Sequence, residues 1–159
     1  MMPKIYKIVG VGLLLILLLA LYAWIQQQRR QDNFSCIANV IQHNKETTIN
    51  LIMSYVFGKD IGYLGVDGNI EQRGEISHTI SRRIFFSYYN EDDNYFMHST
   101  KNIIFPNDDT KDVPLDNYLP QFYLEGGKDI FMKIVYQRSG QYFFYADPVT
   151  TFACKRIER

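Results

Sequence analysis

One unbroken apolar run near the start of the chain, residues 8–25 with the sequence IVGVGLLLILLLALYAWI, constrains its organisation most. A helix of this length spans about 27 Å at ~1.5 Å per residue, close to the hydrocarbon thickness of a bilayer. Tyr22 and Trp24 lie at its end, where amphipathic rings favour the headgroup region. The run therefore predicts a transmembrane helix at 8–25, preceded by a short N-terminus at 1–7 and followed by a polar linker at 26–33.

A cleaved signal peptide is the alternative interpretation of the same run. Such a peptide has an apolar core of about 7–15 residues and a cleavage site of the small-x-small type. Ala23 is the small residue near the end of the run, but Leu21 stands two positions before it. The length of the run and the missing cleavage motif favour an uncleaved anchor.

Two cysteines, Cys36 and Cys154, stand near the two ends of the remaining sequence, residues 34–159. A pair at opposite ends of one domain suits a disulfide formed in an oxidising compartment. Two unrelated buried thiols are the alternative. Two lysines precede the apolar run and two arginines follow it, so charge alone orients the helix weakly. A disulfide would place the C-terminal domain outside the cytoplasm and leave the N-terminus inside.

The charge of the C-terminal part excludes one class of partner. Residues 32–159 carry 13 Lys and Arg against 17 Asp and Glu. A basic stripe is typical of proteins that bind nucleic acids, and the sequence contains none. The segment is long enough for one domain with a sizeable core and too short for two. We therefore expect a single, mildly acidic domain that does not bind nucleic acid.

Strands are predicted by apolar side chains that recur at every second residue. One such alternation runs through residues 49–57 and a second through 76–88. Further clusters at 95–105, 130–137 and 142–146 are rich in Phe, Tyr, Ile and Val, the residues that suit a pleated, half-buried surface.

Turn signals rich in Gly, Pro, Asn and Asp separate these segments. They stand at 58–60, 67–69, 90–94, 106–109, 126–127 and 139–140. Ser139-Gly140 is typical of a two-residue hairpin, and residues 113–120 predict one helical turn that begins at Pro114. About seven to nine strands at this spacing predict a mostly β fold, an antiparallel barrel or sandwich, with a calycin-like barrel favoured.

No catalytic residue, metal ligand or cofactor is predicted. His43, His78 and His98 lack the spacing of metal ligands, and no catalytic motif is present. The acidic run 90–94 offers oxygen atoms for calcium but lacks the spacing of a calcium loop. We interpret it as a solvated turn.

Two features leave a binding role open. Arg82 and Arg83 are adjacent in a predicted strand, so one of them points inward and needs a carboxylate, a bound anion or a position at the mouth of the barrel. Residues 32–159 also hold most of the aromatic residues. Most of these belong in the core, but a few could line a cavity for an apolar ligand.

Nearly the whole chain resembles a known family. The segments that show the resemblance are FSCIANVIQHN after the apolar run, then LIMSYVFGKDIGYLGVDGNI, RRIFFSYYN and FACKR near the C-terminus. These segments resemble the FidL-like family of bacterial inner-membrane proteins. The resemblance implies an inner-membrane location, with a cytoplasmic N-terminus and a periplasmic C-terminal domain. It also implies a gene neighbourhood with a membrane-anchored, winged-helix transcription regulator of the ToxR type.

The same layout is similar to that of ToxS-like accessory proteins. Those proteins bind and stabilise the periplasmic part of their regulator, and some help to form a pocket for a bile-type ligand. We therefore expect a non-enzymatic accessory protein whose β domain binds such a regulator through a strand edge or an aromatic patch. The alternatives are a periplasmic binder of a small apolar ligand, such as a bile salt, and a structural component of a secretion or pilus assembly. No site residue can be transferred from the resemblance.

Overall fold

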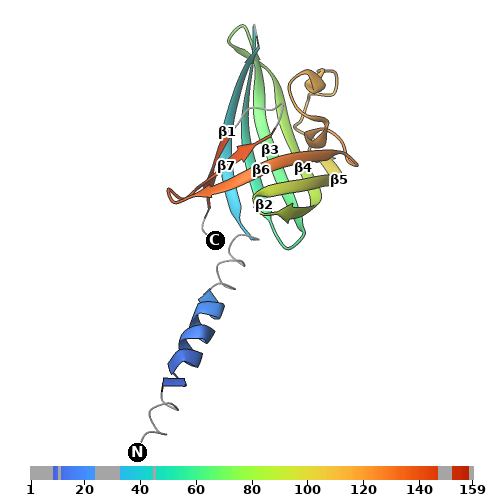
Figure 1. Cartoon of the computed structure of the whole chain (residues 1–159). Helices are drawn as coiled ribbons and strands as arrows, with labels where there is room; N and C mark the ends of the chain where they lie inside the picture. The colour runs from blue at the N-terminus through green and yellow to red at the C-terminus, as the bar shows by residue number, and fades with distance from the viewer. Residues whose placement is uncertain (1–8, 11, 24–32, 45, 147–151, 158–159) are drawn as a thin grey trace, which may run out of the picture. The chain divides into compact units, whose positions relative to one another are not determined.

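The computed structural model describes residues 9–10, 12–23, 33–44, 46–146 and 152–157 (Figure 1). Contacts divide the chain into two compact units, Met1–Asn33 and Phe34–Arg159. In the first unit, residues 9–10 and 12–23 are helical.

In the part of the chain that the structure describes, no helix has both the length and the apolar character needed to cross a membrane. Four positions of the transmembrane helix predicted at 8–25 (8, 11, 24 and 25) lie outside the described residues. Residues 1–7 and 26–32 also lie outside them.

The second unit is a closed barrel of eight antiparallel strands in which each strand pairs with the next. This confirms the predicted mostly β, antiparallel fold and its barrel form. The strands are β1 (Ser35–Asn44), β2 (Thr47–Phe57), β3 (Ile61–Gln72), β4 (Glu75–Glu91), β5 (Asn94–Ile104), β6 (Asp129–Gln137), β7 (Gln141–Tyr145) and β8 (Phe152–Arg156). Two short 3₁₀ helices, η1 (Leu115–Asn117) and η2 (Gln121–Tyr123), lie between β5 and β6. The helical turn predicted within 113–120 is therefore present as η1.

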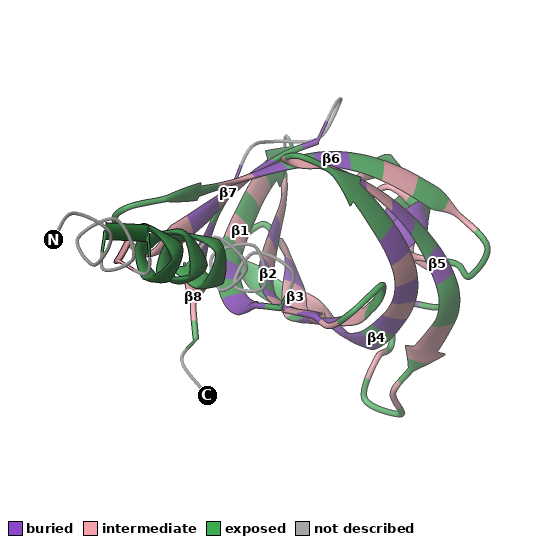
Figure 2. Ribbon diagram, turned by 60° about the horizontal axis from the view of Figure 1, so that its bottom comes forward, coloured by how far each residue is buried: buried purple, intermediate pink, exposed green. Residues whose placement is uncertain are grey.

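Burial alternates along the strands as the sequence pattern predicts (Figure 2). In β2, the residues from Ile49 to Phe57 at odd positions are all buried, and their neighbours at even positions are more exposed. In β4, Ile80, Ile84 and Phe86 are buried in the same way. Side chains on a strand point to opposite faces in turn, so the odd positions of β2 from 49 to 57 and the even positions of β4 from 80 to 88 face the barrel interior.

The turn predicted at Asp67-Gly68-Asn69 is wrong, because these residues lie inside β3. Gly68 pairs with Leu51 of β2, and a Cβ atom at this position would lie 2.0 Å from the carbonyl oxygen of Asn50. The glycine therefore permits two strands to approach closely. The hairpin between β3 and β4 turns at Arg73 and Gly74, whose φ angles are 54° and 86°, as a tight two-residue turn requires.

The barrel is closed by its first and last strands. Cys36 and Ile37 of β1 pair with Arg156 and Lys155 of β8. The expected disulfide joins Cys36 to Cys154 with a Cα–Cα distance of 5.4 Å and a sequence separation of 118 residues. In the chain-entropy model, closing a loop of that size stabilises the fold by up to about 5 kcal/mol.

Aromatic side chains occupy the interior. The Tyr55 ring lies 4.8 Å from the Phe144 ring, and the Phe57 ring lies 4.4 Å from Phe34 and 5.4 Å from Phe86, between centroids. The η2 helix adds Phe122 and Tyr123, which are each 1% exposed. The segment between β5 and β6 thus contributes core residues, and the described centre of the barrel is filled by side chains.

Candidate functional site

A row of three aromatic side chains crosses the outer surface of β4, β5 and β6. Tyr89 pairs with Phe96, and Phe96 pairs with Phe131, in the registers of the two adjacent strand pairs. The ring centroids are 4.7 Å apart for Tyr89 and Phe96 and 5.0 Å apart for Phe96 and Phe131. Tyr89 is 59% exposed and Phe131 is 47% exposed. We call Tyr89, Phe96 and Phe131 the aromatic row.

A hollow of about 570 Å³ lies beside the aromatic row, and its lining also includes Ser87, His98 and Asp129. His98 and Asp129 form the next pair across β5 and β6, and Nδ1 of His98 lies 2.6 Å from Oδ1 of Asp129. The side chain of Asp129 is 83% exposed. Its second oxygen, Oδ2, has no hydrogen bond to any described residue. The hollow therefore has apolar ring surface on one side and a carboxylate on the other.

The strand ends next to the aromatic row are acidic. Glu91, Asp92 and Asp93 form the end of the β4–β5 hairpin, two to four residues beyond Tyr89. Lys133, two residues beyond Phe131 on β6, is an exposed cation nearby. With Asp129 on the opposite side, this surface attracts a positively charged group more than a negatively charged one.

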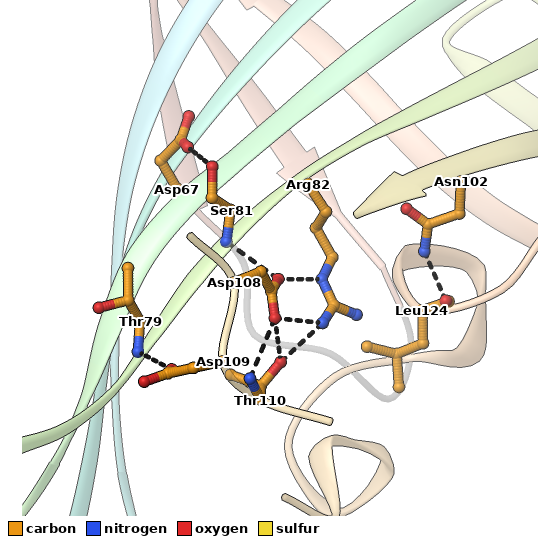
Figure 3. A network of polar contacts seen from close by, with 9 residues as sticks. All are labelled: Asp67, Thr79, Ser81, Arg82, Asn102, Asp108, Asp109, Thr110 and Leu124. Carbon is orange, nitrogen blue, oxygen red and sulfur yellow. Dashed lines mark hydrogen bonds and ion pairs between the residues drawn. The ribbon is translucent and has the colours of Figure 1, made fainter. Parts of the chain in front are cut away.

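A second cluster of polar residues surrounds Arg82, on the inward-pointing face of β4 (Figure 3). Nε of Arg82 donates to Oδ2 of Asp108 at 2.9 Å, and Nη2 donates to Oδ1 of Asp108 at 3.2 Å and to the hydroxyl of Thr110 at 2.7 Å. The side chains of Arg82 and Asp108 are 6% and 1% exposed. The carboxylate partner expected for an inward-pointing arginine is therefore Asp108.

Asp108 also fastens the chain that follows β5. Where β5 ends beside Arg82, the next residues continue along β4: the backbone N–H of Phe105 donates to the Ser81 carbonyl, and Oδ2 of Asp108 accepts the Ser81 N–H at 3.0 Å. Oδ1 of Asp109 accepts the Thr79 N–H at 2.6 Å. The cluster is a clasp that holds the start of the 105–128 segment against the edge of β4.

The charge of the clasp is stable near neutral pH. Burial raises the pKa of Asp108, but hydrogen bonds from Arg82, from Thr110 and from the Ser81 N–H outweigh that effect and lower the pKa below its usual value. The adjacent hollow, of about 620 Å³, contains Lys111 together with Asp116 and Glu125. Since Asp108 already neutralises Arg82, the clasp offers no net positive charge to an anion.

Inside the barrel, the two hydroxyl groups of Tyr55 and Tyr123 lie 3.1 Å apart and form a buried hydrogen bond. Burial raises the pKa of both phenols, so both stay protonated at neutral pH. The pair links β2 to η2 and occupies space that an apolar ligand would need. Both tyrosines belong to the cluster of buried hydrophobic residues that forms the core.

The residues considered as metal or catalytic candidates lie apart. His43 lies in β1, where its Nδ1 contacts the Thr48 hydroxyl at 2.9 Å. His78 lies in β4 and His98 in β5. Among the residues that the structure describes, no group of three or more His, Cys, Asp or Glu side chains could hold a metal ion. The acidic run at 90–94 forms the end of the β4–β5 hairpin, with its turn at Asp92 and Asp93.

The sequence did not identify the aromatic row, the Asp129 carboxylate or Asp108. Tyr89 lies three residues before Asp92 and Phe96 lies three residues after Asp93, so a hairpin that turns at these two residues could have paired them. The place of Phe131 beside Phe96 depends on the long connection between β5 and β6, for which local sequence contains no register signal. Asp108 stood in a predicted turn, and only the fold brings it to Arg82.

The comparisons with known proteins identify a family. The sequence model of the YqeJ C-terminal domain matches residues 33–154, which is more than half of the chain and most of the barrel unit. The chain therefore belongs to the YqeJ C-terminal domain family. The comparisons with curated proteins and with solved structures returned no match.

Proposed function

We propose that this chain is a non-enzymatic accessory protein of the bacterial inner membrane whose periplasmic barrel binds a membrane-anchored transcription regulator of the ToxR type. The apolar run at 8–25 would tether it, with residues 1–7 in the cytoplasm. The next-neighbour order of the eight strands supports a calycin-like barrel. The regulator as partner class is supported by the resemblance to the FidL-like family and by the layout of ToxS-like accessory proteins.

The observation that carries the proposal is the contrast between a filled interior and an exposed aromatic row. Tyr55, Phe57 and Phe144 fill the centre of the barrel, which weighs against a ligand cavity there. Tyr89 and Phe131 are exposed on the outside, and exposed aromatic side chains are enriched where proteins bind one another. Two proteins tethered to one membrane meet at high effective concentration, so a small surface of this kind suffices.

Gene deletion and complementation test the proposal. The gene is deleted, and the amount of the neighbouring regulator and the transcription of its targets are measured with and without the full-length chain. We expect both values to fall on deletion and to return with the wild-type chain, but not with a Tyr89→Ser, Phe131→Ser double variant. A matched control, Ile52→Ser, removes a side chain that is 51% exposed on β2 and should restore both values. Unchanged values under every inducing condition, including bile salts, would favour a structural component of an assembly.

Topology is tested separately. Alkaline phosphatase fused to the C-terminus should be active, because the disulfide and the barrel would lie in the periplasm. The mature protein should also retain the apolar run. A mature form that begins after Ala23 would contradict the membrane tether, but it would leave the proposed binding surface of the barrel unchanged.

A further inference from the structure

We propose that the hollow beside the aromatic row is a receptor for a basic side chain, an arginine or a lysine flanked by aliphatic residues on an extended segment of the partner protein. This inference rests on the proposed function in one respect only, that the occupant is a polypeptide. It adds which surface of the barrel is used and which chemistry the partner presents.

The walls of the hollow match the two parts of such a group. The rings of Phe96 and Phe131 offer apolar contact for an aliphatic stem, and an aromatic face attracts a cation electrostatically. Asp129 lines the same hollow, its side chain is 83% exposed, and its contact with His98 is made through Oδ1. A guanidinium or ammonium group between the rings and this carboxylate would contact both. Ser87, a small residue, leaves room between them.

The outer surface of this barrel already contains one contact of the same kind. The guanidinium carbon of Arg83 lies 5.3 Å from the centroid of the Tyr63 ring and 5.7 Å from that of Phe105. Arg83 thus lies over rings presented by the neighbouring strand β3 and by the residue that follows β5. The aromatic row has the same kind of ring surface, and Tyr89 and Phe131 remain about half exposed.

Charge selects a basic occupant over the alternatives. Glu91, Asp92 and Asp93 lie beyond one side of the aromatic row, and Asp129 lies on the other. The basic residues set against these four carboxylates are Lys133 and His98, whose ring contacts Asp129. A second copy of this mildly acidic domain would bring like charges together at this surface. An acidic or phosphorylated segment would be repelled in the same way. The complementary occupant is therefore a basic segment with apolar neighbours.

The experiment uses the full-length chain in detergent micelles, with the aromatic side chains labelled for NMR, and three capped tripeptides as probes. The first is acetyl-Val-Arg-Val-amide, and the other two replace its arginine with norleucine or glutamate. We expect saturable shifts of the Phe96 and Phe131 ring signals with the arginine peptide, and binding at least about threefold weaker for the norleucine peptide. The glutamate peptide should be weaker still.

Variants of Asp129 and Phe131 test what the carboxylate and the aromatic rings of the hollow each contribute to binding. Asp129→Asn should weaken binding of the arginine peptide and leave the norleucine peptide unchanged, and Phe131→Ser should weaken both. Ile52→Ser, on a distant strand, should change neither. Equal binding of the three peptides, or shifts confined to another face of the barrel, would overturn the proposal. Shifts of the aromatic row that depend on protein concentration without peptide would assign it to a second copy of the chain instead.

The test separates this inference from the proposed function. If regulator levels depend on Tyr89 and Phe131 but the arginine peptide binds no better than the others, the partner proposal stands and the basic-side-chain proposal fails. If the arginine peptide binds the aromatic row but deletion leaves the regulator unchanged, the receptor stands and its partner is another basic protein.

Discussion

The inside and the outside of this barrel use the same residue types for different purposes. Tyr55, Phe57 and Phe144 are at most 3% exposed and pack against one another in the interior. Tyr89 and Phe131 also lie against Phe96, with ring centroids 4.7 Å and 5.0 Å from it, yet each is about half exposed. The inner rings stabilise the fold because they leave water completely. The outer rings keep part of their apolar surface exposed to water, so their contribution to stability is small.

Truncation of one ring in each set gives the largest expected contrast. Phe57→Ala should lower the free energy of unfolding by about 3–5 kcal/mol, because it removes buried surface and leaves a cavity. Phe131→Ala should lower it by less than about 1 kcal/mol. Chemical unfolding followed by the near-ultraviolet circular dichroism of the tyrosines measures both, since the single tryptophan, Trp24, precedes residues 34–159 in the sequence. Equal losses for the two variants would remove the distinction.

The disulfide joins the strands that close the barrel around its interior rings. Its loss should have the next largest effect on the free energy of unfolding. The Cys36→Ser, Cys154→Ser double variant should lose about 3 kcal/mol, because β1 and β8 pair through only two residues each and the bond constrains a long loop. Reduction of the wild-type protein should cause the same loss. On a non-reducing gel the wild-type chain should migrate faster than the variant. Free thiols titrated in the folded, unreduced protein would contradict the bond.

The clasp should contribute less than the disulfide, and in a pH-dependent manner. Asp108→Asn should cost about 2 kcal/mol at pH 7, because it leaves the buried Arg82 charge with weaker partners. The pKa of Asp108 is lowered in the folded state, so its contribution is present above the unfolded pKa of about 4 and is lost as pH falls through the folded pKa. Unfolding at pH 7 and near pH 3 should show a smaller difference between wild type and variant at the lower pH. A difference that is the same at both values would exclude this linkage.

The smallest effect is expected at the tyrosine pair. Tyr55→Phe keeps the ring in place and removes only the hydrogen bond to Tyr123, at a cost of about 1 kcal/mol. Since Tyr123 belongs to η2, this variant tests whether the 105–128 segment is held by its rings or by the hydroxyl contact. A loss as large as that of Phe57→Ala would show that the hydroxyl pair, and not ring packing, holds η2 in the barrel.

Local pattern predicted much of the barrel. The alternation at 49–57 and the helical turn near Pro114 are present, and the alternation at 76–88 is present from Ile80 onward, whereas Ile76 is 66% exposed. The hairpin at Ser139-Gly140 is also present, but its loop has three residues, 138–140, and not two. They depend on neighbours in sequence, and such neighbours interact whatever the rest of the chain does. The prediction of a turn at 67–69 was wrong because Gly68 is needed where β3 approaches the backbone of β2 closely. That contact forms only when the chain folds.

By itself the sequence determined the β class of residues 34–159 and the fact that one of Arg82 and Arg83 must point inward. It also limited any disulfide within the chain to Cys36 and Cys154, because only two cysteines are present. The tertiary structure alone decided that Arg82 is the inward residue and that Asp108 is its partner, 26 positions away. It also decided that Phe131 completes the aromatic row with Tyr89 and Phe96. The physical reason is register: the long connection between β5 and β6 allows many alignments of these strands, and only packing of the whole barrel selects one.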